Sequence, residues 1–88
     1  IGDDCAVYRP KAGEDLVFTT DFTIEGRHFT LPDYTPAQVG YRALARGLSD
    51  IAAMGAEPRW ALISLAMPDE AFARPFFRGV FTHKVPLI

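Results

Sequence analysis

The stretch TPAQVGYRALARGLSDIAAMG, residues 35–55, carries the strongest structural signal in this chain of 88 residues. Thr35 belongs to the residue types that cap helix N-termini, and Pro36 suits a first turn because its missing N–H would have no partner there. Gly55 can end the helix in a left-handed conformation. Together these signals predict one long helix that runs from Pro36 to about Met54.

The interior of this predicted helix has an apolar stripe and two glycines. Leu44, Leu48 and Ile51 follow one another at spacings of four and three residues, which places them on one face. Gly40 and Gly47 each cost about 1 kcal/mol relative to alanine inside a helix. We therefore expect another part of the chain to pack closely at both glycines.

The residues before the helix have the pattern of a β-hairpin. Residues 6–8 are β-prone, and residues 9–15 contain Pro and Gly where a turn favours them. Residues 16–24 alternate, with mostly apolar side chains on one face and hydroxyls and a carboxylate on the other. This segment is predicted to be a strand whose apolar face lies in the core.

The residues after the helix predict a further strand and a second, shorter helix. Residues 60–67 form an almost continuous apolar run, typical of a central strand buried on both faces. Asp69 is a candidate cap for a helix that Pro75, at its sixth or seventh position, would interrupt. The predicted fold is therefore α/β, of the α+β type. A small mixed or antiparallel sheet would pack against the two helices, and dimerisation could complete that sheet.

Composition excludes several classes of protein. The chain is 49% hydrophobic and 23% charged, which argues against intrinsic disorder. Its net charge of −2 gives no basic surface for nucleic acid or an anionic membrane, and residues 60–67 are far shorter than the roughly 20 residues of a bilayer helix. The single cysteine, Cys5, excludes an internal disulfide, fits a reducing compartment such as the cytoplasm, and is expected to be a small buried residue.

Four aspartates are candidates for a metal site. Asp3 and Asp4 are adjacent, Asp21 lies in a predicted strand where aspartate is disfavoured, and Asp50 lies near the helix C-terminus, where the helix dipole opposes a negative charge. Mg²⁺ prefers oxygen ligands of this kind and often shares its binding with a phosphorylated substrate. The carboxylates therefore favour a hard-cation site, to which Thr19 and Thr20 could add oxygens.

Simpler interpretations of the same residues stay open. The pair Asp3-Asp4 could be solvated surface, and Asp50 could pair with Arg46 four residues earlier. His28, in a predicted loop, could be an ordinary exposed histidine. The chain has no Walker-type glycine loop, no G-x-S-x-G and no H-E-x-x-H, which removes the commonest enzyme classes that such motifs mark.

Three strings in the sequence resemble one family. IGDDCAV (residues 1–7) resembles G-I-G-D-D-[AC]-A, and TTD (19–21) followed by EGRHF (25–29) resembles T-T-D-x-x-x-E-G-x-H-F. LSDIAAMGAEP (48–58) resembles L-S-D-[IL]-A-A-M-G-A-x-P. In this order and spacing they are similar to the amino-terminal half of thiamine-monophosphate kinases, which belong to the aminoimidazole ribonucleotide synthetase-like superfamily.

The resemblance implies a function and a set of ligands. Members of this family phosphorylate thiamine monophosphate to thiamine diphosphate with ATP and Mg²⁺. His28 falls where the family contacts its phosphorylated substrate, and no catalytic base is assigned because an acceptor phosphate is already anionic. The metal-binding positions of the family fall on Asp4, Thr19, Thr20, Asp21 and Asp50.

The resemblance also implies an organisation. Residues 1–70 are expected to form the amino-terminal domain of the kinase, incomplete at its start, and residues 71–88 a divergent or truncated end. We expect a fragment that holds about half of an active site and is inactive alone. Two alternatives stay open: a module that forms a homodimer through the sheet and binds metal or phosphate, or a superfamily member with another phosphorylated substrate.

Overall fold

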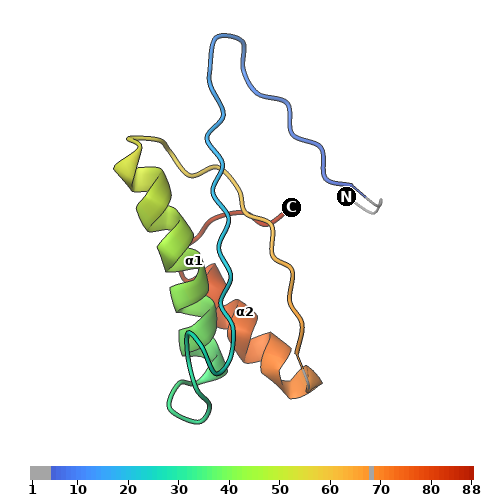
Figure 1. Cartoon of the computed structure of the whole chain (residues 1–88). Coiled ribbons are helices and arrows are strands. Elements are labelled where there is room, and N and C mark those ends of the chain that lie inside the picture. Colours follow the sequence, from blue (N-terminus) through green and yellow to red (C-terminus); the bar gives the residue numbers. More distant parts are fainter. Residues whose placement is uncertain (1–4, 68) are drawn as a thin grey trace.

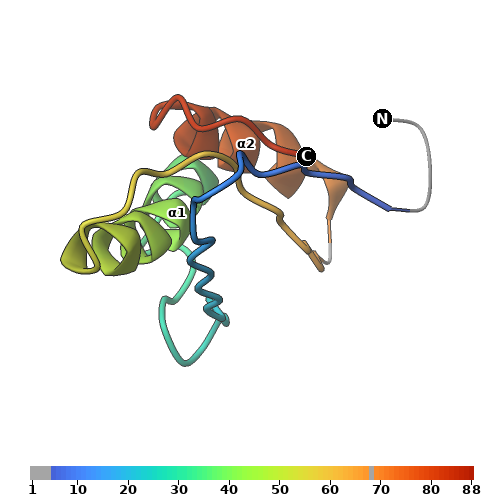
Figure 2. The same ribbon diagram turned by 90° about the horizontal axis from the view of Figure 1, so that it is seen from above.

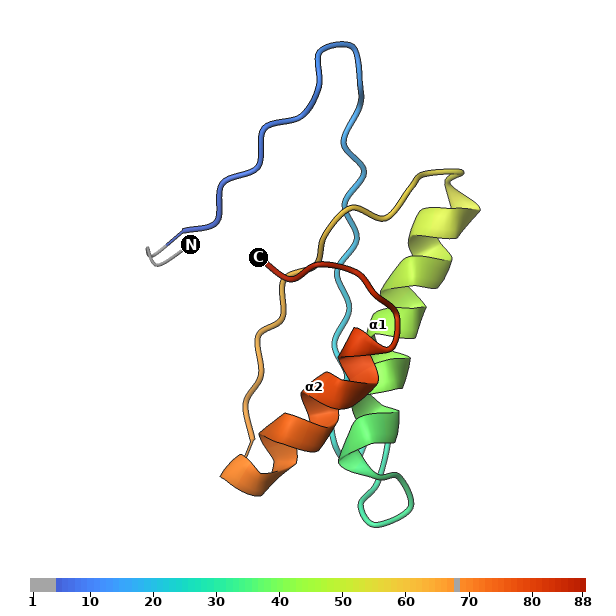
Figure 3. The same cartoon turned by 180° about the vertical axis from the view of Figure 1, so that it is seen from behind.

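The computed structural model describes residues 5–67 and 69–88. Its regular elements are the α-helix α1 (Pro36–Ala53), the 3₁₀ turn η1 (Glu70–Phe72) and the α-helix α2 (Ala73–Phe81). Figure 1 shows residues 16–24 running beside α1 and the segment after α1 returning to η1. Seen from behind, in Figure 3, α2 crosses the amino-terminal half of α1.

The predicted long helix is confirmed as α1. The Thr35 hydroxyl accepts a hydrogen bond from the backbone N–H of Gln38 at 3.2 Å, and the Gln38 side chain accepts one from the Thr35 N–H at 2.8 Å. This reciprocal pair is a capping box, and it satisfies two donors that the first turn leaves without partners. At the other end Met54 caps the helix and Gly55 takes a φ of +67°.

The core lies where α1 and α2 cross. Its buried side chains are Val39, Phe76 and Val80, with Val85 buried close to the end of the chain. A methyl group added at Gly40 would collide with the backbone carbonyl of Phe76. Close packing at this glycine, which the sequence predicts, is therefore confirmed.

Gly79 and Gly47 differ in how closely other parts of the chain pack against them. A methyl group at Gly79 of α2 would collide with the carbonyl of Ala37, so the two helices approach closely from both sides. At Gly47 the nearest atom to such a methyl group is Cγ2 of Thr19, at an ordinary 3.9 Å. The expectation of equally close packing at Gly47 is wrong.

The second helix begins later than predicted, and this removes the conflict with its proline. Asp69 accepts a hydrogen bond from the N–H of Ala71 at 2.9 Å and so caps η1. The α-helix proper starts at Ala73, which leaves Pro75 in its first turn. Backbone N–H groups in a first turn have no intrahelical partner, so a proline there costs no hydrogen bond. The predicted interruption of the helix is wrong for this reason.

The predicted sheet is absent from the part of the chain that the structure describes, so the α/β fold class is wrong. The only ladder contacts there are single bridges, Glu25 with Phe29 and Ala61 with Leu87. The alternating segment exposes the face predicted to be core: Phe18 is 65% and Phe22 80% exposed. Alternation marks a segment able to pair, but pairing requires a neighbour of matching length, and a lone hairpin is marginal in water.

Aromatic contacts, rather than a ladder, hold the extended segments together. Trp60 lies 5.4 Å from Tyr8 and 5.7 Å from Phe18 between ring centroids. Residues 60–67, predicted to be a central strand buried on both faces, are extended but partly exposed to solvent, since Leu62 is 62% exposed. Figure 2 shows these segments as extended tube that passes beside the pair of helices, without the arrows of regular strands. Cys5, predicted to be buried, is exposed at the start of the first segment.

The last residues of the chain fold back on both α1 and the segment before η1. The Ala61 N–H donates to the carbonyl of Pro86 at 2.9 Å, and the His83 ring lies 4.2 Å from that of Tyr41 between centroids. His83 Nε2 is 2.8 Å from the Tyr41 carbonyl oxygen. Within residues 5–67 and 69–88, no helix has both the length and the apolar character needed to cross a bilayer.

Candidate functional site

Two of the predicted metal ligands meet beside the carboxyl-terminal half of α1. Asp21 comes from the extended segment and Asp50 from α1, and both line a pocket of about 310 Å³ together with Arg46 and Ser49. The segment runs along α1 in Figure 1, which is how residues about thirty positions apart come together. The Asp21 side chain is 29% exposed, so water reaches this pocket.

The remaining predicted ligands have different positions. The Thr19 hydroxyl donates to Oδ2 of Asp50 at 3.2 Å, which ties the extended segment to α1. Thr20 is exposed and does not line the pocket. Asp4 lies outside the described residues. The structure therefore brings together Thr19, Asp21 and Asp50, and leaves Thr20 apart from them.

Arg46 is the cation of this pocket. Its Nη2 lies 3.6 Å from Oδ1 of Asp21, and its Nη1 donates to the carbonyl oxygen of Phe22 at 3.2 Å. The ion pair with Asp50, left open by the sequence, is not among the ion pairs of the described residues. Asp50 instead accepts from the Thr19 hydroxyl. The pocket is thus lined by one guanidinium and two carboxylates, which give it a net charge of −1.

The donor atoms of the pocket suit a hard cation. All are oxygens, from two carboxylates and from the hydroxyl of Ser49, with the Thr19 hydroxyl adjacent to them. Mg²⁺ is commonly bound by one or two carboxylates, with water and substrate phosphates as its other ligands. Among the described residues no group of three or more His, Cys, Asp or Glu side chains could hold a metal ion. The residues fit a shared Mg²⁺ site and not a closed protein cage.

His28 lies in a tight turn that its own ring stabilises. Gly26 has a φ of +84°, which favours glycine, and the His28 N–H donates to the Ile24 carbonyl at 2.8 Å. Nδ1 of His28 accepts a hydrogen bond from the Ile24 N–H at 3.0 Å. While Nδ1 accepts this bond, the neutral ring carries its proton on Nε2.

The turn explains why the string EGRHF has its composition. Glycine supplies the left-handed residue, and the histidine closes the turn with Nδ1. Phe29 packs against the core cluster and anchors the turn to the helices. His28 is exposed, so its Nε2–H is available to an anion in solvent.

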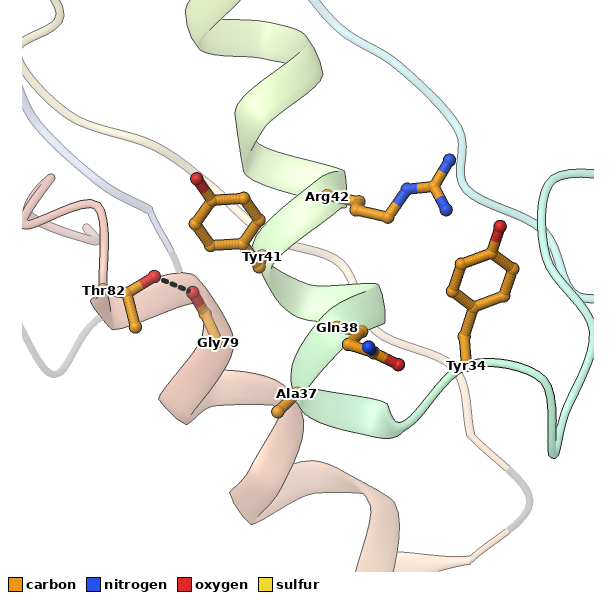
Figure 4. Close-up of a pocket in the computed structure, with 7 residues that line it drawn as sticks. All are labelled: Tyr34, Ala37, Gln38, Tyr41, Arg42, Gly79 and Thr82. Atoms are coloured by element: carbon orange, nitrogen blue, oxygen red, sulfur yellow. Dashed lines mark hydrogen bonds between the residues drawn. The ribbon is translucent and has the colours of Figure 1, made fainter.

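A second pocket, of about 440 Å³, lies over the amino-terminal part of α1. Figure 4 shows Tyr34 and Arg42 on one side of it and Tyr41 and Thr82 on the other. The Arg42 guanidinium carbon is 4.6 Å from the centroid of the Tyr34 ring, a cation–π arrangement. The Thr82 hydroxyl donates to the carbonyl of Gly79 at 2.7 Å. None of the residues predicted for the site lines this pocket.

The pocket lined by Asp21 and Asp50 is called the aspartate pocket below. Sequence reasoning missed two of the residues that line it. It weighed Arg46 only as a partner of Asp50, and it did not single out Ser49. The available signal was helical spacing, because residues three and four apart lie on one face of a helix. Arg46, Ser49 and Asp50 satisfy that spacing, and the pocket is lined by this side of α1.

Comparisons with known proteins agree on one group. The sequence matches the family described as AIR synthase related protein, N-terminal domain, over residues 2–83. It is 46% identical to the thiamine-monophosphate kinase of Escherichia coli (strain K12) over 83 residues, which are 92% of this chain and 25% of that protein. It is 39% identical over 94 residues to the enzyme of the same name from Buchnera aphidicola subsp. Acyrthosiphon pisum, covering 100% of this chain and 29% of that protein.

A third relative is similar over a shorter part of the chain. The thiamine-monophosphate kinase of Bacillus subtilis (strain 168) is 46% identical over 70 residues, 80% of this chain and 22% of that protein. The chain therefore spans about a quarter of the length of the curated relatives it matches. No solved structure matches it significantly.

Proposed function

Because this chain belongs to the family of AIR synthase related proteins, N-terminal domain, we propose that it is part of an ATP- and Mg²⁺-dependent kinase that phosphorylates thiamine monophosphate to thiamine diphosphate. The observation that carries the proposal is the similarity to thiamine-monophosphate kinases over almost the whole chain. Since the chain spans a quarter of those proteins, the complete activity requires residues that it does not contain.

In this proposal the aspartate pocket holds the metal. Asp21 and Asp50 would bind Mg²⁺, with oxygens from Thr19, Thr20 and Asp4 as further candidates. Bound there, Mg²⁺ would neutralise charge on the transferred phosphoryl group, which is the main requirement of phosphoryl transfer. Support comes from the two carboxylates and the Ser49 side chain, which line one pocket and offer oxygen atoms to a metal ion. The Thr19 hydroxyl contributes by fixing the orientation of Asp50.

His28 would bind the phosphate of the substrate. Its Nδ1 is already used in the turn, so Nε2–H is the group that can donate to an anionic oxygen. Transfer would go directly from ATP to the substrate phosphate, which is anionic and needs no base to activate it. The role of this chain is thus to position ligands and balance charge, without a protein nucleophile.

The metal assignment is tested with carboxylate variants of the protein at the full length that its gene encodes. In Asp21→Asn and Asp50→Asn, we expect the Mg²⁺ concentration for half-maximal kinase activity to rise by more than about 10-fold, since even outer-shell partners of a metal are worth that much. Asp33→Asn, an exposed carboxylate in the loop before α1, is the matched control and should behave as wild type. Wild-type Mg²⁺ dependence in both pocket variants would contradict the assignment.

A second function, assembly, is favoured by one observation. Large apolar side chains of the extended segments are exposed, with Val7 at 83% and Phe22 at 80%. Where such side chains adjoin one another, they can form an interaction surface. We propose that a second copy of the chain covers them in a homodimer, through side-chain contacts.

We also propose that the protein lies in the cytoplasm, a reducing compartment in which the exposed Cys5 would stay reduced.

A further inference from the structure

Arg46 is a charged group in the aspartate pocket that the proposed reaction does not use. Its guanidinium contacts the extended segment twice, at the Asp21 carboxylate and at the Phe22 carbonyl oxygen, 3.6 and 3.2 Å away. The side chain is 47% exposed, so neither contact is sealed from water. An arginine held this loosely can leave one partner for another without unfolding its surroundings.

The position of Arg46 has an electrostatic consequence. It lies against one of the two carboxylates that a cation would need, so a bare divalent ion and the guanidinium compete for Asp21. A metal ion that arrives with a nucleotide is different, because the triphosphate brings negative charge with it. Guanidinium groups bind phosphate oxygens readily, with two parallel donors where geometry allows.

From these contacts we infer that Arg46 is a positioning residue that makes the pocket select a metal–nucleotide complex over a free metal ion. In the absence of ligand it neutralises Asp21 and holds the extended segment against α1. When the complex binds, Arg46 exchanges the Asp21 oxygen for a phosphate oxygen and keeps its bond to the Phe22 carbonyl. The inference rests on the proposed metal site and adds to it the form in which the metal ion is accepted.

The test measures metal binding directly, without turnover. Mn²⁺ replaces Mg²⁺, and free Mn²⁺ is quantified by its electron paramagnetic resonance signal, with and without a non-hydrolysable ATP analogue. In Arg46→Met we expect the affinity for Mn²⁺ alone to rise about 5-fold, because a nearby positive charge is removed, and the affinity for the Mn²⁺–nucleotide complex to fall by a similar factor. A purely structural role would move both affinities in the same direction.

Two further variants make the result decisive. Arg46→Lys keeps the charge and should retain wild-type affinity for Mn²⁺ alone. Arg42→Met removes a charge one helical turn away, beside Tyr34, and should change neither affinity. If wild type binds Mn²⁺ and Arg46→Met binds it no more tightly, or loses both affinities, the inference about Arg46 is overturned while the metal site stands. If wild type binds no Mn²⁺ with or without nucleotide, the proposed metal site itself fails.

Discussion

Gly40 lies at a close approach of the two helices, where the backbone of α2 occupies the space that a side chain would fill. The carbonyl of Phe76 blocks that space, and a backbone group cannot move aside as a flexible side chain can. Gly47, seven residues later on the same helix, faces only the methyl group of Thr19 at 3.9 Å. The two glycines therefore differ in what they contribute, although both are costly for the helix alone.

This difference predicts opposite effects of the same substitution. Gly40→Ala should destabilise the protein by about 1–3 kcal/mol, the usual cost of overpacking a tight contact. Gly47→Ala should stabilise it by about 0.5–1 kcal/mol, because alanine restricts the unfolded chain and favours the helix. Urea denaturation followed by circular dichroism measures both. Equal shifts of the two midpoints in the same direction would show that the helices do not cross at Gly40.

His28 illustrates how one side chain can serve a turn with one nitrogen and a ligand with the other. His28→Asn keeps an acceptor near the position of Nδ1 and removes the Nε2–H donor. We expect the KM for thiamine monophosphate to rise about 10- to 100-fold, the worth of a hydrogen bond to a charged group. The urea midpoint should stay close to wild type, whereas in His28→Ala both quantities should change. An unchanged KM in His28→Asn would exclude His28 from substrate binding.

At the scale of elements, α2 shows how a local conflict is removed by a change of helix type. Asp69 starts a 3₁₀ turn, and the α-helix begins only at Ala73. Pro75 then falls among the residues whose N–H groups have no acceptor within the helix. Its fixed φ suits the first turn, so the residue that is expected to break the helix is compatible with it.

The tolerance of α2 for proline should depend on position. Pro75→Ala should change stability by less than about 0.5 kcal/mol, because no hydrogen bond is gained. Arg78→Pro, at an exposed position three residues later, should cost about 3 kcal/mol or more, because it removes an internal hydrogen bond and clashes with the preceding turn. Helical content and thermal unfolding by circular dichroism compare the two. A large gain in stability in Pro75→Ala would mean that α2 starts earlier than Ala73, because the proline would then interrupt its interior.

At the scale of the whole molecule, few side chains are buried and many apolar ones are not. The core comprises Val39, Phe76, Val80 and Val85, while the extended segments expose Phe18 and other large residues. When another surface covers this apolar area, its removal from water stabilises the complex by about 25 cal/mol per Å². This imbalance is the physical reason to expect association.

Association should be weakened by polar substitutions in the extended segments. We expect sedimentation velocity to show a dimer at tens of micromolar for wild type and a monomer for Phe18→Ser combined with Phe22→Ser. Met54→Ser alters an exposed apolar residue at the end of α1 and should leave the dimer intact. A wild-type protein that sediments as a monomer at this concentration contradicts the proposal.

Local signals in the sequence predict α1 almost to the residue. Its signals are the cap residue Thr35, the proline at position 36 and the left-handed Gly55. Each acts within one helical turn, so no distant contact is required to read them. A local signal is not sufficient for residues 16–24. Their alternation predicts a strand, but the described residues contain no partner strand for it. The division into residues 1–70 and 71–88 stays a prediction.

For the candidate site too, the sequence predicts some features and the tertiary structure decides others. The sequence alone selects Asp21, Asp50 and His28, because aspartate is unusual at those positions and the EGRHF string has a recognisable form. Only the tertiary structure shows that Asp21 takes Arg46 as its partner, and that Asp50 takes Thr19 across 31 positions of the chain. Helix bounds depend on hydrogen bonds between near neighbours, which a sequence displays directly. The pairing of charges, and the lack of a sheet among the described residues, depend on which distant segments meet, and here the extended segment lies against α1 instead of pairing with another strand.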